Sequence, residues 1–310
     1  HSTADQGRLI ERDVGVDRHK AGFMHHGVFA HGSDAGHLAE GHAVPAVYAA
    51  MATLGVVVGK EGDRRKLTTD DLSGLRDWHS VLDGHPNPME GMPFFDAATG
   101  SLGMGLSVAA GVARAARLDG YDKRVYCIIG DGEAREGQIA EALDFIVDQK
   151  LTNVLPIFNC NGYGQADRVS VQQGTARLTA KLKAFGYEVV EIDGHAPAQI
   201  KQAFDKFASI SGDEKATPMA VVAKTVKGWG SPSIQGGGWH GKPPTADALR
   251  KALAELDERR IELTSALSGA DQFTIEPPTE ANAKEAPSAD LPPLADAMKA
   301  LDMETVLHTG

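Results

Sequence analysis

Residues 124–163 read RVYCIIGDGEAREGQIAEALDFIVDQKLTNVLPIFNCNGY, and they predict a β-strand, an α-helix and a second β-strand. The apolar runs at Val125–Ile129 and Asn153–Phe158 are typical of buried strands. Between them, residues 136–150 place apolar side chains at helical spacing. A helical crossover makes the two strands parallel, so their carboxyl ends meet at one edge of the sheet. Ligands of such sheets bind at that edge.

Oxygen-bearing residues follow both of these strands. Asp131 comes directly after the first strand, within Gly130-Asp131-Gly132, and Asn161 comes after the second. Carboxylate and amide oxygens suit Mg²⁺ or Ca²⁺, and these ions often complete their shell with phosphate. Tyr163 lies two residues past Asn161, so its backbone carbonyl is a candidate third ligand. The sequence therefore predicts a cation site with oxygen ligands.

The composition excludes several classes of protein. The 310 residues are 42% hydrophobic and 24% charged, which is ordinary for a globular protein. A net charge of -11 without a basic stripe argues against a nucleic-acid partner. Two cysteines, Cys127 and Cys160, predict no disulfide framework and a reducing compartment. No apolar run reaches membrane-spanning length and no signal peptide is visible, so we expect a cytoplasmic protein without a membrane partner.

The remaining pattern alternates helices and strands. Helices are predicted at residues 46–54, 106–118, 178–185, 198–208 and 245–257, and further strands at residues 187–192 and 218–224. This alternation predicts an α/β fold, an open and mostly parallel sheet with helices on both faces. The predicted division is an irregular N-terminal arm at 1–36, a ligand-binding domain at 37–267, and a linker with a short C-terminal helix at 268–310.

Three histidines fall in loops beside strand ends or helix starts. His42 precedes the first predicted helix, and His85 lies in the rigid turn Gly84-His85-Pro86. His240 belongs to a glycine-rich loop after the last predicted strand. Taken alone, His42 is better explained as a surface histidine that caps or packs locally. Histidines with a pKa near neutral do suit proton transfer.

Two other interpretations fit the sequence less well. The glycine loop at residues 100–105 is not a dinucleotide fingerprint, because the third glycine and a following acidic residue are missing. His25, His26 and His31 match no zinc signature. We therefore expect residues 1–36 to form a loop or arm that lies on a partner.

In combination, these motifs resemble the diphosphate-binding N-terminal half of transketolases, a family of thiamine diphosphate enzymes. The resemblance runs from Gly41 to about Leu256. It implies the thiamine diphosphate-binding fold and thiamine diphosphate as the cofactor. It also implies that Asp131, Asn161 and the Tyr163 carbonyl hold Mg²⁺ or Ca²⁺, which in turn holds the diphosphate.

The resemblance further implies which residues meet the cofactor and the substrate. The implied cofactor-binding residues are Ser101, Leu102, Gly103, Gly130, Asp131, Gly132, Glu133, Asn161, Lys224 and His240. The implied catalytic residues are His42, His85, His240 and Glu136. Among these, Glu136 is similar to an acidic residue of a proton network that spans the family's dimers.

The implied reaction is transfer of a two-carbon ketol unit from a ketose or its phosphate to an aldose or its phosphate. In transketolases, a glutamate of a second, pyrimidine-binding domain activates the cofactor. That domain normally follows the linker, where this sequence ends. We therefore expect a split enzyme whose active site is completed by a second subunit, in an α2β2 heterotetramer.

Some residues depart from the family pattern. The early Ser-Gly-His-Pro-Gly stretch is not found before His42. Asn159-Cys160-Asn161 is more similar to the homodimeric 2-oxoacid dehydrogenase E1 enzymes, and Met104 stands where transketolases usually have glutamine. Two alternatives therefore stay open: an E1-type 2-oxoacid decarboxylase or dehydrogenase component, and a non-catalytic assembly subunit.

Overall fold

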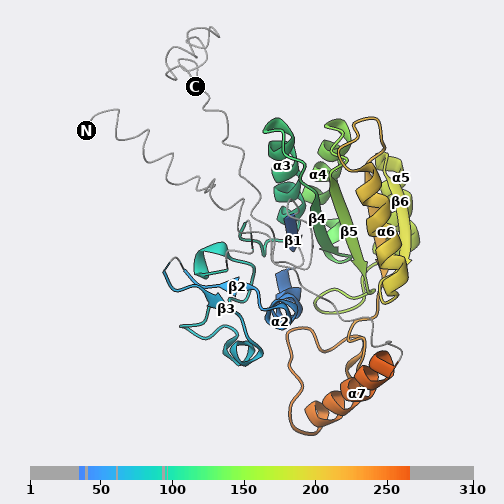
Figure 1. Ribbon diagram of the computed structural model, residues 1–310. Helices are drawn as coiled ribbons and strands as arrows, with labels where there is room; N and C mark the ends of the chain where they lie inside the picture. The colour runs from blue at the N-terminus through green and yellow to red at the C-terminus, as the bar shows by residue number, and fades with distance from the viewer. Residues whose placement is uncertain (1–34, 39–40, 61, 93–94, 96, 266–310) are drawn as a thin grey trace, which may run out of the picture. The chain divides into compact units, whose positions relative to one another are not determined.

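The structure is a computed structural model that describes residues 35–38, 41–60, 62–92, 95 and 97–265 (Figure 1). The histidine tract, most of the predicted arm, and the predicted linker and terminal helix lie outside the described residues. Ala35 and Gly36, the last two residues of the predicted arm, lie in the first strand of the sheet.

Five parallel strands form the central sheet, in the order β1-β4-β5-β7-β6. They are β1 (Ala35–Leu38), β4 (Val125–Gly130), β5 (Val154–Cys160), β6 (Glu188–Asp193) and β7 (Met219–Lys224). A separate antiparallel pair joins β2 (Val57–Val58) and β3 (Arg65–Lys66). The predicted α/β fold with a parallel sheet is confirmed. The sequence did not predict β1, β2 or β3, because two to four residues are too few to show a strand period.

Helices flank the sheet and fill its connections. The α-helices are α2 (Val44–Leu54), α3 (Met104–Leu118), α4 (Gly137–Asp148), α5 (Thr175–Phe185), α6 (Pro197–Ile210) and α7 (Ala246–Ser265). The 3₁₀ turns are η2 (Gly41–Ala43), η3 (Thr69–Gly74), η4 (Pro88–Glu90), η5 (Glu133–Arg135), η6 (Val171–Gln173) and η7 (Pro232–Ile234). All five separately predicted helices are present, and α7 runs eight residues past its predicted end.

Alternate side chains of β4 enter different cores on the two faces of the sheet. Cys127 and Ile129 belong to the apolar cluster of α3, α4 and α5. Tyr126 faces the other way, with its ring 5.3 Å from the ring of Phe207 in α6. Ile128 packs against the cluster built around α2. Burial on both faces explains why this strand is an unbroken apolar run.

The register of the sheet places the two predicted ligand segments side by side. Gly130 of β4 pairs with Asn159 of β5, and the Asp131 N–H donates to the Asn159 carbonyl at 3.2 Å. Asp131 and Asn161 therefore leave the sheet at the same edge, as the predicted β–α–β unit requires.

Both cysteines are buried and neither forms a disulfide, with Cys127 in β4 and Cys160 ending β5. Within the described ranges, no helix combines the length and the apolar character needed to cross a membrane.

We predict that Phe158→Ala lowers the free energy of unfolding by about 3–5 kcal/mol, because removing a buried ring leaves a cavity. Phe158 is fully buried in β5 within the largest core cluster. Urea unfolding followed by circular dichroism measures this loss. Phe145→Ala is the matched control, since Phe145 on α4 is 42% exposed, and it should cost much less. Equal losses in the two variants would contradict the described core.

Candidate functional site

Asp131 is the buried carboxylate at the carboxyl end of β4. Its side chain is 1% exposed, and its Oδ2 accepts the Gly162 N–H at 2.6 Å. Burial raises the pKa of Asp131, while backbone N–H groups led by Gly162, and the charge of Lys227, oppose that rise. The bond to Gly162 joins the end of β4 directly to the turn that follows β5.

Asn161 and Tyr163 form that turn. The Asn161 Oδ1 accepts the Tyr163 N–H at 2.9 Å, which closes a short loop around the amide side chain. Gly162 between them has a φ of +79°, a conformation that glycine adopts without strain. The structure thus brings Asp131 and Asn161 together, as the sequence predicts. The Tyr163 carbonyl as a third ligand stays a prediction.

Glu133 ties the glycine loop before α3 to the end of β4. This carboxylate is 3% exposed; its Oε1 accepts the Gly103 N–H at 2.7 Å and its Oε2 the Gly130 N–H at 3.2 Å. Burial raises the pKa of Glu133, the two N–H donors lower it, and the nearby Glu136 charge raises it further. Glu133 therefore fixes backbone at the site, and its role as a direct cofactor ligand stays a prediction.

Glu136 lies where α3 and α4 begin side by side. Gly103, the N-cap of α3, has a φ of +91°, and a Cβ there would lie 3.2 Å from the Glu136 Cβ. Glu136 is itself the N-cap residue of α4 and is half-buried. The glycine permits this close approach, so the predicted catalytic Glu136 lies next to the predicted cofactor loop.

Three predicted segments from distant parts of the chain converge at His85. A Cβ at Gly41 would lie 2.9 Å from the His85 Cδ2 and 3.2 Å from the Gly100 Cα. A Cβ at Gly100 would also lie 2.9 Å from the His85 Cδ2. The His85 ring therefore occupies space that only glycines leave. His42 follows Gly41 in η2, which places its backbone beside this group, and its side chain lies outside the described structure.

His240 meets a lysine that the sequence interpretation did not single out. The Lys227 Nζ lies 3.1 Å from the His240 Nδ1 and 3.4 Å from the Gly164 carbonyl oxygen. Lys227 is half-buried, and its charge acts on Asp131. A positive side chain therefore stands between the predicted catalytic histidine and the predicted cation ligands, where it can bind an anion.

The Tyr163 ring connects the turn after β5 with the glycine-rich loop that carries His240. A Cβ at Gly236 would lie 3.1 Å from the Tyr163 Oη, and one at Gly237 would lie 3.3 Å from its Cε1. The Arg168 guanidinium lies over the Tyr163 ring, 5.0 Å from the ring centroid. Loops after β4, β5 and β7 are thus in one connected group.

The remaining predicted residues lie around this group. Ser101 is exposed and Leu102 is 44% exposed, both in the loop before α3. Lys224 is the last residue of β7 and is exposed, three residues before Lys227. Lys227, rather than Lys224, contacts His240 and places its charge near Asp131.

Gln173 is a second residue that sequence reasoning missed. It is 5% exposed, and its Nε2 donates to the carbonyls of Asp131 at 2.8 Å and Gly132 at 3.1 Å. Gln173 thereby holds the turn that presents Asp131. The only sequence signal was the capping pair of Ser170 with Gln173, which indicates a helix start rather than a site.

The donor set fits a hard divalent cation that carries a diphosphate. The buried Asp131 carboxylate accepts a backbone N–H of the turn that carries the Asn161 amide oxygen, and the charge of Lys227 acts on Asp131. Among the described residues, no group of three or more His, Cys, Asp or Glu side chains gathers to hold a metal. A site rich in nitrogen or sulfur ligands, as zinc prefers, therefore does not form in that part of the chain.

Comparison with known proteins gives one consistent family. A profile described as "Transketolase, thiamine diphosphate binding domain" matches residues 32–258. Transketolase-like protein 2 of Mus musculus is 37% identical over 245 residues, which are 78% of this chain and 35% of that protein. Transketolase of Homo sapiens is 36% identical over 256 residues, or 82% of this chain and 36% of that protein. The chain thus spans about a third of the length of these curated relatives.

Solved structures give the same fold. A crystal structure of transketolase from Pichia stipitis, complexed with sedoheptulose 7-phosphate, matches with a TM-score of 0.59 at 20% identity. The match covers 84% of this chain and 40% of that one.

We predict that Glu133→Gln lowers the free energy of unfolding by about 1–3 kcal/mol, because the amide nitrogen would face one of two buried backbone N–H groups. Urea unfolding measures the change. Glu141→Gln is the control, since Glu141 is exposed on α4. If the two variants were equally stable, the Glu133 bridge would not hold the loop to the strand.

Proposed function

The chain belongs to the transketolase family through its thiamine diphosphate binding domain, and we propose that it is the diphosphate-binding subunit of a thiamine diphosphate-dependent ketol transferase. The family membership confirms the resemblance drawn from the sequence. The observation that carries the proposal is the bond from Gly162 to Asp131, which places a carboxylate and the Asn161 amide at one sheet edge. A divalent cation held there can bind a diphosphate.

Each residue of the site has a proposed role toward the cofactor. Asp131, Asn161 and the Tyr163 carbonyl hold Mg²⁺ or Ca²⁺, and Lys227 offsets phosphate charge. When bound, thiamine diphosphate supplies the carbanion chemistry of the reaction. The loop of Ser101, Leu102 and Gly103 is proposed to lie beside its ring.

The histidines are proposed to move protons. The Lys227 ammonium offers only donors, so the His240 Nδ1 at 3.1 Å accepts from it, and the imidazole is held beside the proposed diphosphate site. An imidazole suits proton transfer near neutral pH. His85 and the segment that carries His42 lie against Gly100 of the glycine loop. Glu136 at the start of α4 is proposed to join a proton network with a second subunit.

The substrates and the partner are further parts of the proposal. We propose that a two-carbon ketol unit passes from a ketose or its phosphate to an aldose or its phosphate. The aminopyrimidine is proposed to be activated by a pyrimidine-binding domain on another polypeptide, in an α2β2 heterotetramer. The two buried cysteines form no disulfide, which supports a reducing compartment, and we propose the cytoplasm.

We predict that Asp131→Ala weakens Mg²⁺-dependent binding of thiamine diphosphate at least about 100-fold, because the cation loses its carboxylate ligand. Isothermal titration calorimetry of the 310-residue chain, alone and with its partner, measures the affinity. Asp148→Ala is the control, since Asp148 is exposed at the end of α4. Undiminished binding by Asp131→Ala would refute the site assignment.

The same titration has an expected pH dependence. Burial raises the pKa of Asp131, and only the ionised carboxylate binds the cation. Affinity should therefore fall as the pH falls through this raised pKa, at higher pH than for an ordinary aspartate with a pKa of about 3.9. In Asp131→Ala this step should be absent.

We predict that the assembled complex converts xylulose 5-phosphate and ribose 5-phosphate and does not decarboxylate pyruvate. Product analysis after separate incubations measures both activities. Turnover of pyruvate alone would favour the E1-type alternative suggested by Asn159-Cys160-Asn161 and Met104. Cofactor binding without either reaction would favour the assembly-subunit alternative. Isolation of the native protein as one chain carrying both domains would contradict the split arrangement.

A further inference from the structure

His195 contacts both flanks of Lys227, although it lies in the loop between β6 and α6. The Val226 N–H donates to the His195 Nε2 at 2.9 Å. The Trp229 ring stacks on the His195 ring, with centroids 4.6 Å apart and an interplanar angle of 6°. We propose that His195 is a positioning residue that sets where the Lys227 ammonium stands in the diphosphate site. This inference rests on the proposed function.

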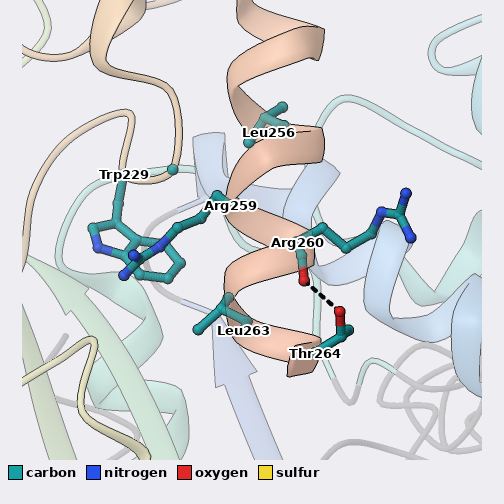
Figure 2. Close-up of a pocket in the computed structure, with 7 residues that line it drawn as sticks. Trp229, Leu256, Arg259, Arg260, Leu263 and Thr264 are labelled. Atoms are coloured by element: carbon teal, nitrogen blue, oxygen red, sulfur yellow. Dashed lines mark hydrogen bonds between the residues drawn. The ribbon is translucent and has the colours of Figure 1, made fainter. Parts of the chain in front are cut away.

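The other side of the same loop is held by α7. Figure 2 shows the Arg259 side chain against the Trp229 ring. The guanidinium carbon lies 4.8 Å from the ring centroid. The Glu255 Oε2 accepts the Ser231 Oγ–H at 2.7 Å and the Ser233 N–H at 3.0 Å. Trp229 therefore contacts both His195 and Arg259. The loop between β6 and α6 and the helix α7 together hold the segment around Lys227.

The loop leaves little room for Lys227 to adjust by itself. Gly228 has a φ of +78°, and a Cβ there would lie 2.6 Å from the Ile234 carbonyl oxygen. The Lys227 carbonyl accepts the Gly236 N–H at 3.1 Å, and the Val226 carbonyl accepts the Trp229 N–H at 3.0 Å. A shift of Val226 or Trp229 is therefore passed to Lys227, because the backbone between them is already bonded at both ends.

The chemistry of the contact requires a particular form of the histidine. An acceptor nitrogen at Nε2 carries no proton, so the neutral ring bears its proton on Nδ1. The backbone N–H of His195 donates to the Asp193 Oδ1 at 2.9 Å, and this bond fixes the backbone that presents the ring. The ring thus makes two separable contributions, a hydrogen-bond acceptor for Val226 and a stacking surface for Trp229.

Variants of the full chain separate these contributions. His195→Gln can place an oxygen near the former Nε2 position, His195→Asn cannot reach it, and His195→Phe keeps only the stacking surface. Losing the acceptor should weaken Mg²⁺–thiamine diphosphate binding about 5- to 20-fold, as expected for one hydrogen bond. We therefore expect that loss in His195→Asn and His195→Phe, and binding within about threefold of wild type in His195→Gln.

A double-mutant cycle distinguishes positioning from general stabilisation. If His195 acts through Lys227, then His195→Phe adds no further loss in a Lys227→Met background. Two independent losses that simply add would overturn the inference, and so would wild-type affinity in both His195→Asn and His195→Phe. His79→Phe is the control, because His79 is exposed and belongs neither to the loop that carries His195 nor to the loop that carries Lys227.

Failure of this inference can be told apart from failure of the proposed function. If neither the wild-type chain nor its complex binds Mg²⁺–thiamine diphosphate, both the positioning role and the proposed function are overturned. Binding that Lys227→Met weakens and the His195 variants leave unchanged would overturn only the positioning role. If His195→Phe does not fold, His195→Gln and His195→Asn still test the positioning role, since both keep a small polar side chain. Equal cofactor affinity in these two variants would overturn that role.

Discussion

The buried Glu133 carboxylate holds together the two halves of the site. Its oxygens accept N–H groups from Gly103, before α3, and from Gly130, at the end of β4. A buried carboxylate is stable only when its oxygens are bonded, so both backbone segments must stay where they are. Through this residue the glycine loop, with its neighbours Gly100 and His85, is fixed relative to Asp131.

The other half of the site depends on contacts between loops that follow different strands. Asp131 reaches the turn after β5 through Gly162, and the Tyr163 ring of that turn lies against Gly236. Gly236 in turn bonds the Lys227 carbonyl. In the proposed function, the cation and the diphosphate meet oxygen ligands that follow β4 and β5 and a positive charge from the loop after β7. Parallel strands make this possible, because all their carboxyl ends lie at one edge.

Sequence reasoning found the fold where the hydrophobic pattern was long enough. The strands at β4 and β5 and the helix α4 between them have unbroken or periodic apolar residues, so their positions and direction could be predicted. Strand β1 has only four residues, so its position could not be predicted. The choice between Lys224 and Lys227 was also beyond the sequence, since both lie near the end of β7 and only the loop's path brings Lys227 to His240.

Residues 124–163 by themselves determined a parallel β–α–β unit with Asp131 and Asn161 at one edge. The period of the apolar residues, the turn residues and the chain direction are local properties of the sequence, and they suffice to predict this unit. The tertiary structure alone decided which distant groups join that edge. Gln173 on the Asp131 turn, His195 beside Lys227, and His85 between Gly41 and Gly100 come from separate segments. Their contacts arise from the packing of loops around the sheet, which no local pattern specifies.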